Sequence, residues 1–507
     1  ISLNVLEPNT SNGSLSKIAR IGHDGIVKKI VGTNTGGFSG DGGLAGAAQI
    51  ELVRGVNFDK DGNIYLVDWG NNRIRKIFSA LPESNLTDII ITNEAGTEYY
   101  VFNSRGRHLR TLDATTGVTI YSFGYNTDGQ LTSITDVDGD VVTMQRDGNG
   151  RPTSITSADG QTTTLGVNSL GQLTSVTNPA NETHSMHYTA GRMTTYTKPR
   201  NKSNTFAFDN DGRLISDVDP VGGGWTLSRV DTIGSNQWRV DMTSGEGRIS
   251  RFRVTPTAVG NRVQENTLPD GGKAKTFFFK SGIGRTSTYD GTFVETTSRP
   301  DPRYGMFSPV VDLKVKTPSN IQAVVDSERT ATLSDEADPF CHASLLETIS
   351  FNGKTSTLEF TSSNDTWTLT TPENRVATAK INSASRQTEL NFTGFDPINY
   401  GYDSRGRLSS ISQGARSNTY DYHDTGVEKG YLASITDSLN RQFSFNYDSA
   451  GRVIKETLPD SRFITYEYDE NGNLSKLITP SNNEHIFNYT DVDLEGQYTP
   501  PTVSGIT

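Results

Sequence analysis

The stretch Tyr402-Asp403-Ser404-Arg405-Gly406-Arg407-Leu408 decides the fold, because variants of it recur through much of the chain. Each copy has Asp or Asn at its second position and Gly three residues later; the copies occupy residues 125–131, 146–152, 167–173, 208–214, 447–453 and 468–474. In the first half the equivalent glycines follow one another at intervals of 20 to 23 residues: Gly106, Gly129, Gly150, Gly171, Gly191 and Gly212. A fixed period in the twenties is typical of repeat architectures, in which each unit buries its apolar face against its neighbours.

The repeated unit favours a β-hairpin. Asp or Asn at the first position of a type I turn can bond its own backbone, and Gly three residues later supplies the positive φ that closes the turn. Before the turn, residues 443–447 alternate aromatic and polar side chains, as a half-buried strand does. After it, Leu131 and Ile134 are three apart, which predicts a β-bulge or a strand end. The turn residues assigned on this basis are Asp209, Gly212, Asp403, Gly406, Asp448, Gly451, Asp469 and Gly472.

Composition limits the class of protein. The formal net charge of −11 argues against binding of nucleic acid phosphate as the main task. The 50 Gly, 22 Phe and 19 Tyr residues are typical of a turn-rich all-β protein. The single cysteine, Cys341, excludes an internal disulfide framework and is expected to be a buried thiol. No apolar run reaches the roughly 18 residues that a membrane-spanning helix needs, so we expect no membrane contact within this segment.

The first eighty residues carry a different unit. The glycine-rich stretch 36–50 leads into 55–68 and closes with Trp69-Gly70-Asn71-Asn72-Arg73-Ile74-Arg75-Lys76-Ile77. This unit resembles an NHL repeat, the blade of a β-propeller, and an incomplete earlier copy ends near Ile21. One and a half blades cannot close a ring. Either further blades precede residue 1, or these two pack against the repeats that follow.

The Tyr-Asp-x-x-Gly-Arg-Leu pattern resembles the YD repeat of the Rhs and teneurin superfamily, and it covers roughly residues 95–225 and 346–495. The resemblance implies an all-β fold: partial NHL propeller blades, then hairpins joined edge to edge into a long spiralling antiparallel sheet that forms a hollow shell. Closing such a sheet would remove its open edges. The expected domains are blades at 1–80, a YD-repeat array at 81–225, an irregular β insert at 226–345 and a second YD-repeat array at 346–507.

Two further stretches resemble elements of bacterial Rhs-type proteins. Residues 299–306 resemble an insert of those proteins and favour a bacterial origin. Asp219-Pro220-Val221-Gly222 resembles part of their self-cleaving boundary. It stands in the middle of the array without the rest of that motif, so we assign no protease activity to it.

Residues with catalytic or ligand-binding chemistry are scattered. His184 and His187 lie three apart in an expected strand, which points their rings to opposite faces. The adjacent Cys341 and His342 suit neither a metal pair nor a thiolate held by a base. The acidic stretches 59–63 and 136–140 resemble the start of a calcium loop but lack its flanking helices and its closing Glu, which favours simple turns. We therefore expect no catalytic residue, no metal site and no cofactor.

The Arg that follows many turn glycines is a separate question. Examples are Arg107, Arg151, Arg192, Arg213, Arg407 and Arg452. A ladder of Arg residues that pair with neighbouring Asp residues explains them better than a track for carbohydrates or anions.

Three functions from different classes remain. The first is a non-enzymatic, rigid β-shell scaffold for adhesion or intercellular contact, within a large cell-surface or secreted protein. The second is an Rhs-type shell that encloses a C-terminal toxin effector lying outside this segment. The third is an enzyme or glycan-binding protein, which would need a convergent acid pair and an aromatic platform. We favour the first, with a protein or cell-surface partner, and we expect the chain, which begins without Met, to be part of a longer polypeptide.

Overall fold

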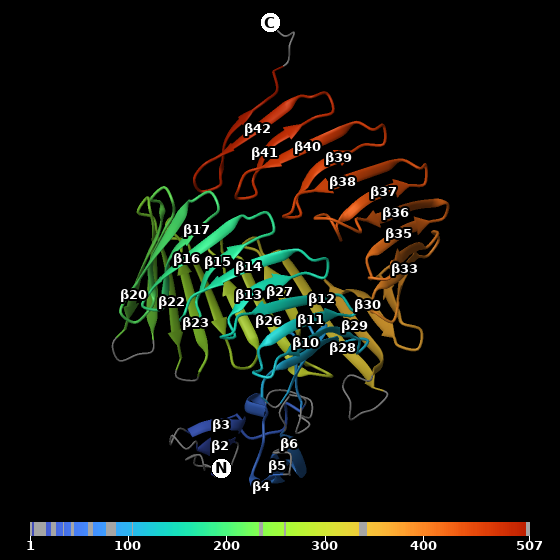
Figure 1. The fold of residues 1–507 in the computed structure, drawn as a ribbon. Helices are drawn as coiled ribbons and strands as arrows, with labels where there is room; N and C mark the ends of the chain where they lie inside the picture. The colour runs from blue at the N-terminus through green and yellow to red at the C-terminus, as the bar shows by residue number, and fades with distance from the viewer. Residues whose placement is uncertain are drawn as a thin grey trace. The chain divides into compact units, whose positions relative to one another are not determined.

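The structure is a computed structural model that describes residues 3–4, 17–21, 27–33, 35–41, 45–58, 64–77, 88–103, 105–232, 237–257, 260–333 and 342–502. Its regular structure consists of β-strands and two short 3₁₀ helices, and the described residues contain no α-helix (Figure 1). The strands from β7 to β43 follow one another in sequence order in a 37-strand antiparallel sheet. The prediction of an all-β chain built on one long sheet is confirmed. In this part of the chain, no helix is long and apolar enough to cross a membrane.

The chain divides into two compact units. The first unit comprises Ile1–Thr119, Val254–Glu265 and Gly272–Ala377, and the second comprises Ile120–Arg253, Asn266–Gly271 and Thr378–Thr507. This division follows contacts in space, whereas the predicted domain boundaries follow repeat type and stay a prediction.

The N-terminal part of the first unit holds two three-stranded sheets. Their elements are β1 (Leu3–Asn4), β2 (Lys17–Ile21), β3 (Val27–Gly32), η1 (Ala45–Ala47), β4 (Val53–Phe58), β5 (Ile64–Asp68), η2 (Trp69–Asn71) and β6 (Arg73–Ile77). Ile18, Val31, Ile50, Val53 and Leu66 form one buried cluster. The turn expected at 59–62 lies outside the described residues, and the assignment to NHL blades stays a prediction.

The rest of the first unit is sheet with long strands. Its elements are β7 (Asp88–Thr92), β8 (Glu98–Asn103), β9 (His108–Asp113), β24 (Lys273–Phe278), β25 (Ile283–Ser287), β26 (Phe293–Asp301), β27 (Gly305–Lys316), β28 (Gln322–Leu333), β29 (His342–Phe351), β30 (Lys354–Thr361) and β31 (Thr366–Thr370). Four strands cross the limits between the units: β10 (Thr119–Tyr125), β22 (Ile249–Pro256), β23 (Arg262–Thr267) and β32 (Val376–Ile381). Tyr99, Val101, Leu112, Ala114 and Tyr304 form the apolar core of this sheet.

The second unit contains two runs of short hairpins. The early array consists of β10 (Thr119–Tyr125), β11 (Leu131–Asp136), β12 (Val141–Arg146), β13 (Pro152–Thr156), β14 (Thr162–Val167), β15 (Leu173–Thr177), β16 (Thr183–Thr189), β17 (Arg192–Thr197), β18 (Ser203–Phe208), β19 (Leu214–Val218), β20 (Gly224–Asp231) and β21 (Trp238–Ser244). The late array consists of β33 (Gln387–Phe392), β34 (Ile398–Tyr402), β35 (Leu408–Gln413), β36 (Arg416–Tyr422), β37 (Leu432–Asp437), β38 (Gln442–Tyr447), β39 (Val453–Thr457), β40 (Phe463–Tyr468), β41 (Leu474–Ile478), β42 (Glu484–Tyr489) and β43 (Glu495–Thr499). In Figure 1 the strands of each array lie side by side in sequence order.

A β-bulge recurs at one end of each repeat. The register shifts between Gly124 and Tyr125, so that Phe123 pairs with Ile134 but Tyr125 pairs with Leu131. The same shift occurs at Gln145/Arg146 and at Gly166/Val167. The extra residue lets apolar residues three apart contribute to the same cross-strand row, so the predicted bulge is confirmed.

Apolar side chains of the second unit form a row on one face of the sheet. Val176 pairs with both Leu165 and His184, and opposed residues of an antiparallel pair share a face. Met186 and Tyr196 continue the row. These side chains are half-buried, and the fully buried apolar side chains among the described residues all belong to the first unit. Backbone pairing and polar contacts therefore contribute a large share of the second unit's stability.

Candidate functional site

The predicted turn residues share one geometry. The Oδ1 atom of Asp403 accepts hydrogen bonds from the backbone N–H groups of Arg405 and Arg407, both at 2.9 Å. Gly406 has φ +69° and donates its N–H to the carbonyl of Asp403 at 3.0 Å. The other three pairs repeat this arrangement, with φ between +83° and +86° at the glycine: Asp209 and Gly212, Asp448 and Gly451, Asp469 and Gly472. Burial raises the pKa of Asp403, but the hydrogen bonds from Arg407 and Arg405 outweigh it and hold that pKa below its usual range.

Arg407 and Arg452 each contact their own turn and the next repeat. Arg407 Nε lies 2.7 Å from Asp403 Oδ2, and its guanidinium lies 4.2 Å from the ring centroid of Tyr422. The Tyr422 hydroxyl in turn donates to the carbonyl of Leu408 at 2.9 Å. The same hydroxyl contact joins Tyr468 to Val453 and Tyr489 to Leu474. The expected pairing of these Arg residues with a neighbouring Asp occurs within the turn at Arg151, Arg213, Arg407 and Arg452. Arg407 reaches the next repeat through an aromatic ring.

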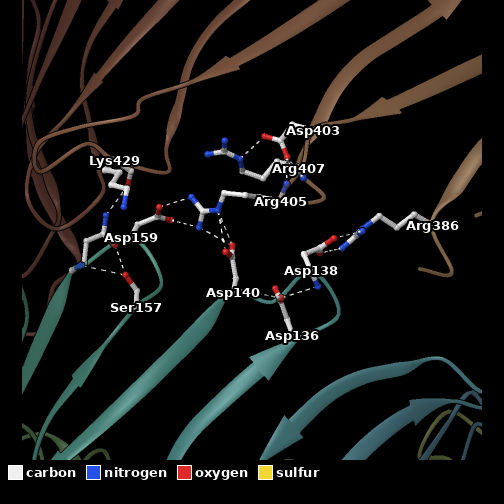
Figure 2. Close-up of polar contacts among 11 residues, drawn as sticks. Asp136, Asp138, Asp140, Ser157, Asp159, Arg386, Asp403, Arg405, Arg407 and Lys429 are labelled. Atoms are coloured by element: carbon white, nitrogen blue, oxygen red, sulfur yellow. Dashed lines mark hydrogen bonds and ion pairs between the residues drawn. The ribbon is translucent and has the colours of Figure 1, made fainter. Parts of the chain in front are cut away.

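Turns of the early array meet turns of the late array along a line that we call the seam. Figure 2 shows its first part, where Arg386 pairs with Asp138, with one contact of 2.8 Å between Nη1 and Oδ1. Arg405 lies between two successive turns and contacts Asp140 at 2.6 Å and Asp159 at 2.5 Å. Hydrogen bonds with these two carboxylates raise the pKa of Arg405 above its ordinary value, so it stays charged.

The seam continues one turn at a time. Gln161 Nε2 donates to the carbonyl of Lys429 at 2.7 Å, and Arg452 Nη2 lies 2.8 Å from Glu182. At the turn 198–202 the contacts comprise Lys198 with Asp493 at 2.6 Å, Arg200 with Asp469 at 3.3 Å and with Asp493 at 3.5 Å, and Lys202 with Asp491 at 2.9 Å. Burial raises the pKa of Asp493, but the hydrogen bonds from Lys198, Asn471 and Asn473 outweigh it and lower that pKa.

A polar groove opens within the seam. It has a volume of about 520 Å³ and lies between the turns 178–182 and 198–202 of the early array and residues 468–470 of the late array. Its lining includes Glu182, Lys198 and Asp469, each of which is already engaged in an ion pair. The groove therefore offers a polar surface on which these three charged side chains already have partners.

Comparison with known proteins identifies the sheet. The family model described as Teneurin YD-shell matches residues 87–496. The chain belongs to the teneurin YD-shell family. Human Teneurin-4 is 25% identical over 511 residues, which cover 98% of this chain and 17% of that protein. Mouse Teneurin-1 is 25% identical over 522 residues, which cover 99% of this chain and 17% of that protein.

The YD shell thus spans about a sixth of the length of these relatives. Among solved structures, the Photorhabdus luminescens Tc holotoxin pore is similar, with 13% sequence identity and a TM-score of 0.39, over 83% of this chain and 26% of that one.

The other candidate residues of this YD shell lie apart. His184 pairs with Val176 and His187 pairs with Thr195, so the two rings point to opposite faces as predicted. His184 Nδ1 lies 2.7 Å from the Tyr196 hydroxyl. Asp138 and Asp140 of the acidic stretch pair with Arg386 and Arg405, which accounts for their charge without calcium. No group of three or more potential metal ligands occurs among the residues that the structure describes.

Cys341 and residues 59–63 lie outside the described part of the chain. His342 is described and lies buried, with its ring 6.1 Å from that of Phe360 in an edge-on arrangement.

The first unit holds a buried ionic cluster that the sequence did not reveal. Asp301 and Arg303 have side chains 0% and 1% exposed, and Arg303 N–H donates to Asp301 Oδ1 at 2.6 Å. Arg329 bridges Asp301 at 2.8 Å and Glu347 at 2.6 Å. Burial raises the pKa of Asp301, but Arg303 outweighs this effect and lowers it. The sequence signal for this cluster was the insert-like stretch 299–306, which contains the turn 301–305. Sequence spacing alone does not identify the charged residues that pair with this turn.

Proposed function

We propose that this YD shell is a non-enzymatic, rigid scaffold within a larger cell-surface or secreted protein, and that its surface serves adhesion or intercellular contact. The observation that carries the proposal is the use of the motif's own side chains. In the repeat that begins at Tyr402, Asp403 accepts two backbone hydrogen bonds and Arg407 pairs with it and stacks on Tyr422. Groups that could do acid–base chemistry therefore hold the repeats together.

The partner in this proposal is a protein or a cell-surface group. The net charge of −11 disfavours nucleic acid. Because the chain corresponds to 17% of the length of its teneurin relatives, the proposal concerns the part that this segment plays in a larger molecule.

Cell aggregation tests the scaffold proposal. Cells that display the full-length protein should aggregate, and aggregation should survive His187→Ala and Asp219→Asn, because neither residue would act as a catalyst. Deletion of the YD shell should abolish aggregation while the remaining domains stay on the surface. Aggregation that persists after this deletion, or a single His or Asp substitution that abolishes a turnover activity of the folded protein, would contradict the proposal.

A second candidate function is a container for an effector domain. It is favoured by the half-buried apolar row of the second unit, which includes Leu165, Val176 and Met186. A sheet face of this composition is suited to lie against a second polypeptide chain. Limited proteolysis of the full-length protein separates the two functions. Protection of a segment encoded beyond residue 507 until the shell is opened supports the container, and immediate cleavage of that segment supports the scaffold.

A further inference from the structure

The sign of the charges reverses along the seam. The first three early-array turns of the seam contribute acids: Asp138 and Asp140, then Asp159, then Glu182. They meet Arg386, Arg405 and Arg452 of the late array. The fourth turn contributes cations, Lys198, Arg200 and Lys202, and these meet Asp469, Asp491 and Asp493. The reversal falls between the turns 178–182 and 198–202.

A repeat array faces a problem of register. The early seam turns 136–140, 157–161, 178–182 and 198–202 are all five-residue turns with a positive φ at the fourth residue, and the late turns 403–407, 448–452, 469–473 and 490–494 have the same form, whereas the late turn 423–431 is longer. Each repeat adds two strands, so a displacement of one array by one repeat moves it by roughly 10 Å, twice the usual strand spacing. Away from the turn 423–431, such a displacement brings five-residue turns of the same form opposite one another. Backbone shape therefore distinguishes the native register from its neighbours at the turn 423–431 but not at the five-residue turns of the seam.

The charges do distinguish the registers. A displacement of one repeat in one direction places Glu182 opposite the turn of Asp469, where two acids meet. A displacement in the other direction places Lys198 and Arg200 opposite Arg452, where cations meet. Without the reversal, the acidic turns 136–140 and 157–161 would find Arg or Lys side chains in either displaced register, because Arg405, Lys429 and Arg452 follow one another in the late array.

We propose that the charge reversal between Glu182 and Lys198 sets the register in which the two arrays meet. The reversal acts by placing like charges opposite one another in the displaced seams, which it penalises more than it strengthens the native one. Arg200 is central because its guanidinium contacts Asp469 and Asp493, while its backbone N–H donates to the side-chain oxygen of Asn471. This inference concerns assembly of the YD shell and goes beyond the proposed scaffold function.

The test measures distances across the seam in the full chain by pulsed electron resonance. Spin labels are placed at the exposed positions Leu170→Cys and Phe395→Cys, or Leu170→Cys and Leu494→Cys, with Cys341 replaced by Ser. The two late-array positions lie toward opposite ends of the seam, so a slip lengthens one distance and shortens the other. The reversal is removed by combining Lys198→Glu, Arg200→Glu and Lys202→Glu.

In the reversal variant we expect a second population of molecules, in which one of the two label-to-label distances lengthens and the other shortens. The reason is that turn 198–202 moves by roughly 10 Å toward Arg452. The control combines Arg248→Glu, Arg441→Glu and Arg462→Glu, which changes the net charge equally at exposed turns outside the seam. The control should keep the wild-type distances. If the Glu variant does not fold, the neutral combination of Lys198→Gln, Arg200→Gln and Lys202→Gln is measured in the same way. Wild-type distances in the folded reversal variant, or broadening equal to that of the control, would overturn the proposal.

Discussion

Two requirements coincide at Gly406. Its φ of +69° favours glycine, and a Cβ atom there would collide with the paired side chains of Arg386 and Asp138. Gly171 has φ +80° in the equivalent turn of the early array, but a Cβ atom at that position would meet open space. The two glycines thus share the need for a positive φ. They differ because only Gly406 lies against an ion pair of the seam.

Substitution by Ala separates these requirements. Gly171→Ala should lower the free energy of unfolding by about 1–2 kcal/mol, because only the left-handed backbone is strained. Gly406→Ala should cost about 1–3 kcal/mol more, because it also displaces a charge-assisted hydrogen bond. Denaturant unfolding of both variants measures the difference. Equal losses would show that the Arg386–Asp138 pair adjusts without cost.

His342 gives the first unit a dependence on pH. Burial lowers the pKa of His342 below its ordinary 6.5, and the nearby Arg303 guanidinium lowers it further. The unfolded chain therefore takes up a proton below about pH 6.5 while the folded chain resists it. Stability is full above that pH and falls as the pH decreases toward the pKa of the folded state.

Thermal melting from pH 7.5 to 5 should therefore show a smaller loss of stability on acidification for His342→Gln than for the wild type. His187→Gln is the control for the loss of a histidine as such, because His187 lies in a strand of the second unit. An unchanged profile for His342→Gln would place the acid sensitivity elsewhere.

At the scale of single residues, the sequence predicts what is local. The Asp–Gly spacing suffices to place Asp403 and Gly406 in a turn, because both contacts lie within five residues. It does not predict that Arg405 contacts Asp140 and Asp159, which are about 250 residues away in the sequence. A local sequence pattern does not identify contacts between residues that are so far apart in the chain.

At the scale of elements, alternate turns of a hairpin array have different roles. In the late array the seam uses the turns of the YD motif itself, such as 403–407 and 448–452. In the early array it uses the other set, such as 136–140 and 178–182. The sequence predicts both sets of hairpins and the bulge beside Tyr125, since these follow from periodicity. It treats all copies of the motif as equivalent, because periodicity does not specify which edge of an array has a partner.

Arg452 and Arg441 provide a matched pair for testing the difference between a turn inside the seam and a turn outside it. Each pairs with an Asp four residues earlier in its own turn, with Nε to Oδ2 distances of 2.7 Å, but only Arg452 also contacts Glu182. A double-mutant cycle with Arg452→Met and Glu182→Gln should give a coupling energy of about 1–2 kcal/mol, because both side chains are mostly buried. Arg441→Met should have no measurable effect, because its side chain is 62% exposed. Absence of coupling in the cycle would mean that the Arg452–Glu182 contact contributes nothing to stability.

At the scale of the whole molecule, the two units rely on different interactions. The first unit has an apolar core and the buried cluster around Asp301. The second unit depends more on partly exposed ion pairs such as Arg405 with Asp140. The sequence predicts one long all-β chain but not this contrast, because the pattern of strands and turns does not show which side chains meet in space.

Hydrogen–deuterium exchange measured at low and at high salt should reveal this difference between the two units. Raising the ionic strength from about 0.1 M to 1 M shortens the screening length from about 10 Å to about 3 Å. Exchange at the seam turns 157–161 and 198–202 should accelerate in 1 M salt, whereas exchange at 301–305 should be unchanged. Equal responses at these sites would contradict the assignment of the seam as the more electrostatic junction.

The one-to-one contacts of the seam also constrain how such a protein can grow. A tandem duplication within the early array would advance every later turn past its partner, so that Lys198 and Arg200 would no longer reach Asp469 and Asp493. The same holds for a duplication in the late array. Lengthening is compatible with the seam only when both arrays gain a repeat together, with matching charges. Repeat number in the two arrays should therefore change in step during evolution, although about 250 residues of sequence separate them.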